Sequence, residues 1–254
     1  MTTVVYLGNR IIADTRATIQ EEGYVSENGE KQLLNDQTVK CRTFDPGYMW
    51  DEERDIRLIG CSGTMGGIRK FVAFMKLLRC PMEQFILTLG VRDSGLLWKI
   101  IGLEKPSSFI LCLNTGESIR LSITPKTHIY KGPDKKIKAV GSGAFYFDAL
   151  KDVFDVDPET IFRIAINTDK YSSKDTFVEG VYDPEKQTWT LDPEPFKYTH
   201  PLDPEVLVNG FNPHVKAILK GALDIITTLP EEAPSENPEV EDHIPVKIPT
   251  VKKG

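Results

Sequence analysis

Two threonines follow Met1, and the first of them, Thr2, has the clearest potential for chemistry in this sequence. If Met1 is removed, Thr2 becomes the N-terminal residue and carries a hydroxyl nucleophile and an α-amine together. A free α-amine titrates at about pH 7.7–8.0, so it can take the hydroxyl proton, directly or through a water, without a separate histidine. Such a site also needs a nearby cation, a carboxylate that positions the cation, and a backbone N–H that receives the oxyanion.

The elements that would position this residue follow from the hydrophobic pattern. Apolar runs and period-two alternation predict strands at 3–7, 10–13, 38–44, 56–61, 107–114, 118–123, 137–143, 176–182 and 188–191. Helical spacing and end signals predict helices at 68–78, 82–103 (with an interruption), 144–154 and 158–168. The order is strands, two helices, strands, two helices, strands. It predicts an α+β fold, a four-layer αββα sandwich of two antiparallel sheets flanked by helices.

Composition narrows the class of protein. The chain has 254 residues with 27% charged and 40% hydrophobic residues, which is typical of a globular protein. The net charge of −6 argues against binding to nucleic acid or to an anionic membrane surface. No apolar run approaches the roughly 20 residues of a spanning helix, and no signal peptide is visible. We therefore expect a cytoplasmic protein that binds neither nucleic acid nor membrane.

The four cysteines form no C-x-x-C pair and stand far from the histidines in sequence. Zinc ligands usually come in such closely spaced pairs, so we expect no metal, and nothing in the sequence calls for a cofactor. Each cysteine falls in an apolar stretch, which favours reduced, buried side chains.

Composition also changes along the chain. We expect one main domain over 1–195 and a C-terminal helical appendage over 196–228. From 229 to 254 the chain is rich in proline and acidic residues, which predicts a flexible tail.

Five stretches give the sequence a resemblance to a known family. They are MTTVV, IIADTRAT, IGCSGTMGG, AVGSGAFYFDAL and DKYSSK, and they occur in order between Met1 and Tyr182. The sequence resembles the proteasome β-type subunits and their bacterial relative, the HslV peptidase, within the N-terminal nucleophile hydrolases. The resemblance implies that family's sandwich fold and a threonine-type peptidase or amidase.

The resemblance also implies roles for individual residues. Thr2 would be nucleophile and base, Asp14 its acidic partner, and Lys40 the cation, with Lys31 as the competing candidate. The backbone N–H of Gly63 would form the oxyanion hole. The hydrogen-bonded support around the Thr2 amine would be Ser142, Asp169 and Ser172. Four residues would bind substrate: Arg16 and Thr18 along the substrate strand, Cys61 and Met65 in the first specificity pocket.

Three functions remain open from the sequence. The first is a threonine peptidase that acts on peptides within a homo-oligomeric ring or related assembly, with an ATPase or scaffold as a further partner. The second is a non-catalytic structural or scaffolding subunit of the same fold, suggested by a retained Met1, by the altered DKYSSK loop and by the C-terminal region. The third is an amide hydrolase of the same wider class that acts on a small metabolite.

Overall fold

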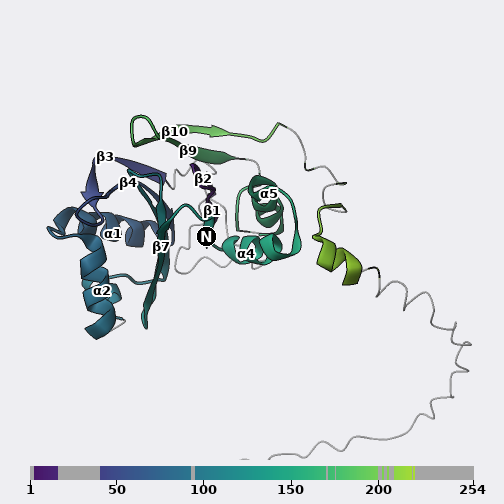
Figure 1. Ribbon diagram of the computed structural model, residues 1–254. Coiled ribbons are helices and arrows are strands. Elements are labelled where there is room, and N and C mark those ends of the chain that lie inside the picture. The colour runs from purple at the N-terminus through teal and green to yellow at the C-terminus, as the bar shows by residue number, and fades with distance from the viewer. Residues whose placement is uncertain are drawn as a thin grey trace, which may run out of the picture. The chain divides into compact units, whose positions relative to one another are not determined.

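The computed structural model describes residues 3–16, 41–92, 95–169, 171–174 and 176–199, together with 202, 205, 209–218 and 220. The chain divides into two units, Met1–Asn212 and Pro213–Gly254. In the second unit, residues 213–218 and 220 are helical. The described part of the first unit forms two five-stranded antiparallel sheets, with helices on both sides of the pair (Figure 1). The predicted α+β sandwich is therefore confirmed, whereas the predicted domain limits stay predictions.

The first sheet has the strand order β10-β9-β2-β1-β8. Its strands are β1 (Thr3–Tyr6), β2 (Arg10–Asp14), β8 (Lys138–Gly141), β9 (Phe177–Asp183) and β10 (Thr188–Phe196). β1 lies between β2 and β8 and is antiparallel to both, with Thr3 opposite Gly141 and Val4 opposite Ala13. The N-terminal strand is thus held on both edges, and its first residue has a fixed register.

The second sheet has the order β3-β4-β5-β6-β7. Its strands are β3 (Cys41–Met49), β4 (Asp55–Ser62), β5 (Ser107–Leu113), β6 (Ser118–Ile123) and β7 (His128–Asp134). β3 continues to Met49 through a register shift, beyond the end predicted for this strand at residue 44. The sequence pattern did not predict β7. Both strands contain proline and both lie at a sheet edge, where a missing N–H breaks no ladder on the open side.

Among the described residues, five helices flank the two sheets. They are α1 (Met65–Leu77), α2 (Met82–Arg92), α3 (Leu96–Ile101), α4 (Ala144–Val153) and α5 (Pro158–Thr168). Local chemistry fixes where two of them begin. The Asp157 side chain accepts from the Thr160 amide at the start of α5, and the Thr64 hydroxyl accepts from the Gly67 amide at the start of α1. Such caps satisfy amides that the first helical turn cannot.

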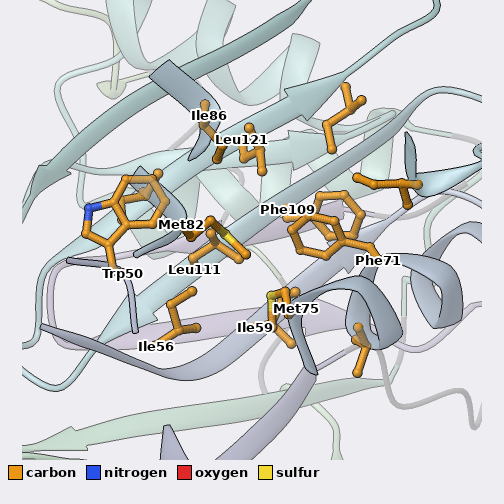
Figure 2. Close-up of a cluster of buried hydrophobic side chains, with 14 of the residues drawn as sticks. Trp50, Ile56, Ile59, Phe71, Met75, Met82, Ile86, Phe109, Leu111 and Leu121 are labelled. Atoms are coloured by element: carbon orange, nitrogen blue, oxygen red, sulfur yellow. The ribbon is translucent and has the colours of Figure 1, made fainter. Parts of the chain in front are cut away.

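Three hydrophobic clusters separate the four layers. One lies between the second sheet and α1–α3, where Phe71 stacks on Phe109 with ring centroids 3.9 Å apart (Figure 2). A second, including Val4 and Leu58, lies between the sheets, and a third lies between the first sheet and α4 and α5. In β1, Val4 therefore faces the second sheet while Val5 faces α4 and α5, as alternation in a strand requires.

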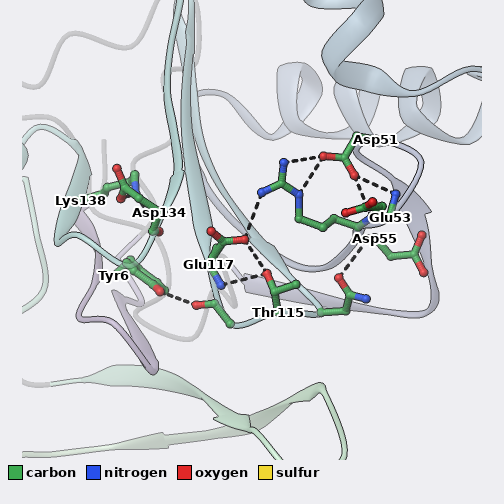
Figure 3. Close-up of polar contacts among 11 residues, drawn as sticks. Tyr6, Asp51, Glu53, Asp55, Thr115, Glu117, Asp134 and Lys138 are labelled. Atoms are coloured by element: carbon green, nitrogen blue, oxygen red, sulfur yellow. Dashed lines mark hydrogen bonds and ion pairs between the residues drawn. The ribbon is translucent and has the colours of Figure 1, made fainter.

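The space between the sheets is closed at one end by the turn between β5 and β6. Three aromatic side chains of the first sheet donate hydrogen bonds to backbone oxygens there. These bonds are Tyr6 Oη to Gly116 O at 2.5 Å, Tyr182 Oη to Asn114 O at 2.7 Å and Trp189 Nε1 to Leu113 O at 2.9 Å. Figure 3 shows the Tyr6 bond beside the polar contacts of the same turn. Because Tyr6 ends β1, this closure, which we call the aromatic clasp, lies at the far end of β1 from Thr3.

Residues 210–212, the last of the first unit, pack against the end of α4. Phe211 stacks on Phe154 with centroids 4.6 Å apart, and the Asn212 amide donates to Val153 O at 2.8 Å. These contacts hold residues 210–212 against the end of α4. Within the described part of the chain, no helix is long and apolar enough to cross a membrane.

Candidate active site

The site forms around Thr3, the first described residue, at the start of β1. Thr3 is fully buried. Its amide donates to Asp14 Oδ2 at 2.5 Å, its hydroxyl lies 2.6 Å from Ser172 Oγ, and the Gly143 amide donates to that hydroxyl at 3.0 Å. Residues from β2, from the start of α4 and from the loop after α5 therefore meet at the N-terminal strand.

Asp14 ends β2 and is fully buried. Its Oδ2 accepts from the Thr3 amide, and its Oδ1 accepts from the amides of Arg16 at 2.9 Å and Ser173 at 3.2 Å. Burying a carboxylate is costly unless its oxygens are hydrogen-bonded. Here three backbone amides offset the loss of hydration of the carboxylate. The carboxylate in turn joins β1, β2 and the loop after α5.

A second buried carboxylate, Asp169, caps the end of α5 and is 2% exposed. Its Oδ2 accepts from Ser142 Oγ at 2.5 Å and from Ser172 Oγ at 2.8 Å, and its Oδ1 accepts from the Tyr171 amide at 3.1 Å. Ser172 also contacts Thr3, so Asp169 is linked to β1 through one hydroxyl. The described site thus has two carboxylates, each tied to Thr3 by a short path.

Gly63 lies at the turn where β4 runs into α1. In the space between the sheets, a Cβ on Gly180 would meet Leu58 and Ile11, whereas a Cβ on Gly60 would meet Ile11 and Val4 equally closely. β4 therefore crosses the first sheet from β9 toward β1, and Gly63 directly follows the end of β4. Its φ of +144° is a conformation that glycine adopts readily, and a Cβ there would meet Ser107 Oγ at 2.6 Å.

The other predicted site residues fall into two groups. Thr2, Lys40, Lys31 and Thr18 lie outside the described residues. Cys61 is 3% exposed and packs in the hydrophobic cluster beneath α1. Its thiol pKa is raised, and burial is the main cause. Met65 is 46% exposed at the first position of α1. The roles predicted for all of these residues stay predictions.

The structure thus brings Asp14, Ser142, Asp169 and Ser172 together, and adds Thr3, which sequence reasoning did not select. No local signal in the sequence identifies Thr3, because its pairing with Gly141, the residue before Ser142, is visible only in the fold. Among the described residues, Lys138 is the one lysine that is buried, but it pairs with Tyr6 at the opposite end of β1. No group of described His, Cys, Asp and Glu residues is placed to hold a metal ion.

No family model matches the chain, and no curated protein matches its sequence. Solved structures with some similarity include the Anbu (Gly-1) mutant from Hyphomicrobium sp. strain MC1, at 12% identity and a TM-score of 0.47, covering 91% of this chain and 99% of that one. Another is Anbu (ancestral beta-subunit) from Yersinia bercovieri, at 11% identity and a TM-score of 0.43, covering 91% and 98%. At this level of similarity, the fold assignment rests on the strand order and layers described above.

Proposed function

We propose that this protein is an N-terminal threonine hydrolase that cleaves amide bonds in peptides, with Thr2 as its nucleophile once Met1 is removed. The observation that carries the proposal is the bond from the Thr3 amide to Asp14, together with the hydrogen-bonded network that links the Thr3 hydroxyl to Ser172, Asp169 and Ser142. This network holds the residue directly after Thr2 by its backbone and side chain together. A hydroxyl and an amine on the preceding residue would therefore have a defined position.

The strand geometry favours Thr2 over Thr3 as the nucleophile. Thr3 faces α4 and the loop after α5, and it is fully buried with its hydroxyl engaged on two sides. Alternate residues of a strand face opposite sides, so a residue that extends β1 by one position is expected to face the second sheet. Gly63 directly follows β4, which is a strand of that second sheet.

The reaction follows from these groups. The Thr2 hydroxyl would attack the substrate carbonyl carbon while its α-amine takes the hydroxyl proton. The Gly63 N–H, at the start of α1, would stabilise the oxyanion. The proton would pass to the leaving amine as the C–N bond breaks, and water would then hydrolyse the ester on Thr2. Lys40 or Lys31 would supply the cation, and we propose that the enzyme works as a homo-oligomer in the cytoplasm.

The test uses intact mass spectrometry and hydrolysis of small peptide amides. Protein beginning at Thr2 should gain one adduct from an electrophile that traps N-terminal threonine, and fragmentation should map the adduct to Thr2. Thr2→Ser should retain turnover, whereas Thr2→Ala should lose it together with the adduct. Undiminished turnover by Thr2→Ala would refute the proposal. An adduct on Thr3 instead would transfer the nucleophilic role to that residue.

A further inference from the structure

The donor and the acceptor of each hydrogen bond around Asp169 follow from the number of hydroxyl hydrogens available. Asp169, as a carboxylate, only accepts, and Ser172 has a single hydroxyl hydrogen. Because Ser172 donates that hydrogen to Asp169, the hydrogen between Ser172 and Thr3 must come from Thr3. The chain of bonds therefore runs from Thr3 to Ser172 to Asp169.

The Thr3 oxygen is fixed from its other side as well. It accepts the Gly143 amide at 3.0 Å, and a Cβ on Gly143 would lie 2.1 Å from it. The close approach therefore depends on glycine at position 143. With its hydrogen given to Ser172 and a lone pair given to Gly143, the Thr3 hydroxyl is held in one orientation inside the protein.

We propose that Thr3 is a positioning residue: its hydroxyl fastens the start of β1 to α4 and to the loop after α5, and so sets the orientation of the N-terminal residue before it. The effect on catalysis rests on the proposed function, whereas the role of the hydroxyl in fixing the start of β1 does not. Asp14 holds the Thr3 backbone amide while Ser172 and Gly143 hold the side chain. With both held, residue 3 can neither slide along the sheet nor turn about its own backbone.

Two matched pairs isolate the hydroxyl in full-length protein that begins at Thr2. The first pair is the original protein and Thr3→Val, which replaces the hydroxyl by a methyl group of nearly the same size. The second pair is Thr3→Ser, which keeps a hydroxyl, and Thr3→Ala, which lacks one. If one hydroxyl-free variant fails to fold, the other gives the measurement. Thr88→Val is the control, because Thr88 is exposed on α2 and its hydroxyl donates within its own helix, to Gln84 O.

The first readout is turnover per site, counted with the threonine-trapping electrophile. Removing the hydroxyl should lower kcat about 10- to 100-fold with KM changed less than about 2-fold, since a misplaced nucleophile slows the chemical step. Thr3→Ser should stay within about 3-fold of the original protein. A residue that only supports the fold would reduce the number of folded sites and leave turnover per site unchanged.

The second readout does not need activity. The rate at which an acylating reagent modifies the α-amine, followed against pH, gives the pKa of that amine. The hydroxyl-free variants should shift this pKa, while Thr3→Ser and Thr88→Val should not. A folded Thr3→Val or Thr3→Ala with unchanged turnover and unchanged amine pKa would overturn the positioning role. An inactive original protein whose amine pKa still shifts on loss of the Thr3 hydroxyl would overturn the proposed function alone.

Discussion

The carboxylate of Asp14 should be one of the largest single contributors to stability near the N-terminus. It accepts three backbone amides, those of Thr3, Arg16 and Ser173, and it is fully buried. In Asp14→Asn, one oxygen can still accept, but the new amide group turns its own hydrogens toward a former donor. At least one charge-assisted bond is lost and one buried N–H is left unsatisfied. Each of these costs about 1–3 kcal/mol, so we expect a loss of about 2–6 kcal/mol.

Urea unfolding followed by tryptophan fluorescence and by circular dichroism measures this loss. The slope with urea should stay constant while the midpoint falls, because the surface exposed on unfolding is unchanged. Asp192→Asn is the matched control, since Asp192 is exposed and also accepts a backbone amide, from Glu194 at 3.0 Å. The control should change the free energy of unfolding by less than about 0.5 kcal/mol. A change equally small for Asp14→Asn would refute the reasoning that this carboxylate anchors β1.

Two further predictions concern the cores. Trp189→Phe removes the bond from Nε1 to Leu113 O and should lower the free energy of unfolding by about 1–3 kcal/mol in the same assay, and an unchanged value would contradict the aromatic clasp. The expectation that all four cysteines are buried is wrong for Cys80, which is exposed. A thiol reagent at neutral pH should modify Cys80 and spare Cys41, Cys61 and Cys112, which are buried. The thiol pKa values of Cys61 and Cys112 are raised, mainly by burial, and this keeps both thiols protonated. All four should react in urea, and rapid native labelling of Cys61 would count against its place beneath α1.

Much of the fold follows from local signals in the sequence. Asp157 and Pro158 mark the start of α5 because a capping carboxylate and a proline at the first helical position suit the unpaired amides there. The alternation of β6 and the Gly8 turn after β1 are equally local. β7 was missed because its Gly132-Pro133 pair is a turn signal in isolation. Only its place at the sheet edge makes the proline acceptable, and strand order is not written in any one segment.

The residues of the candidate site likewise divide into those that local sequence motifs predict and one that only the fold reveals. Asp14, Ser142, Asp169 and Ser172 were reached through motifs, and the structure brings them together. Thr3 was passed over because a threonine beside a stronger candidate has no local signature. Its importance comes from Gly143 and Ser172, which lie 140 and 169 positions away in the chain. Partners at that separation are set by sheet order and layer packing.

The aromatic clasp makes the two ends of β1 differ in how the sheets are joined. Tyr6, Tyr182 and Trp189 tie one sheet to a single turn of the other, at the end of β1 opposite Thr3. The hydrogen bonds that join the two sheets there are separated along β1 from those that hold its first residue, Thr3. A substitution that weakens the contact between the sheets at Tyr6 is therefore expected to leave the hydrogen bonds of Thr3 in place, and the reverse should hold for a substitution at Thr3.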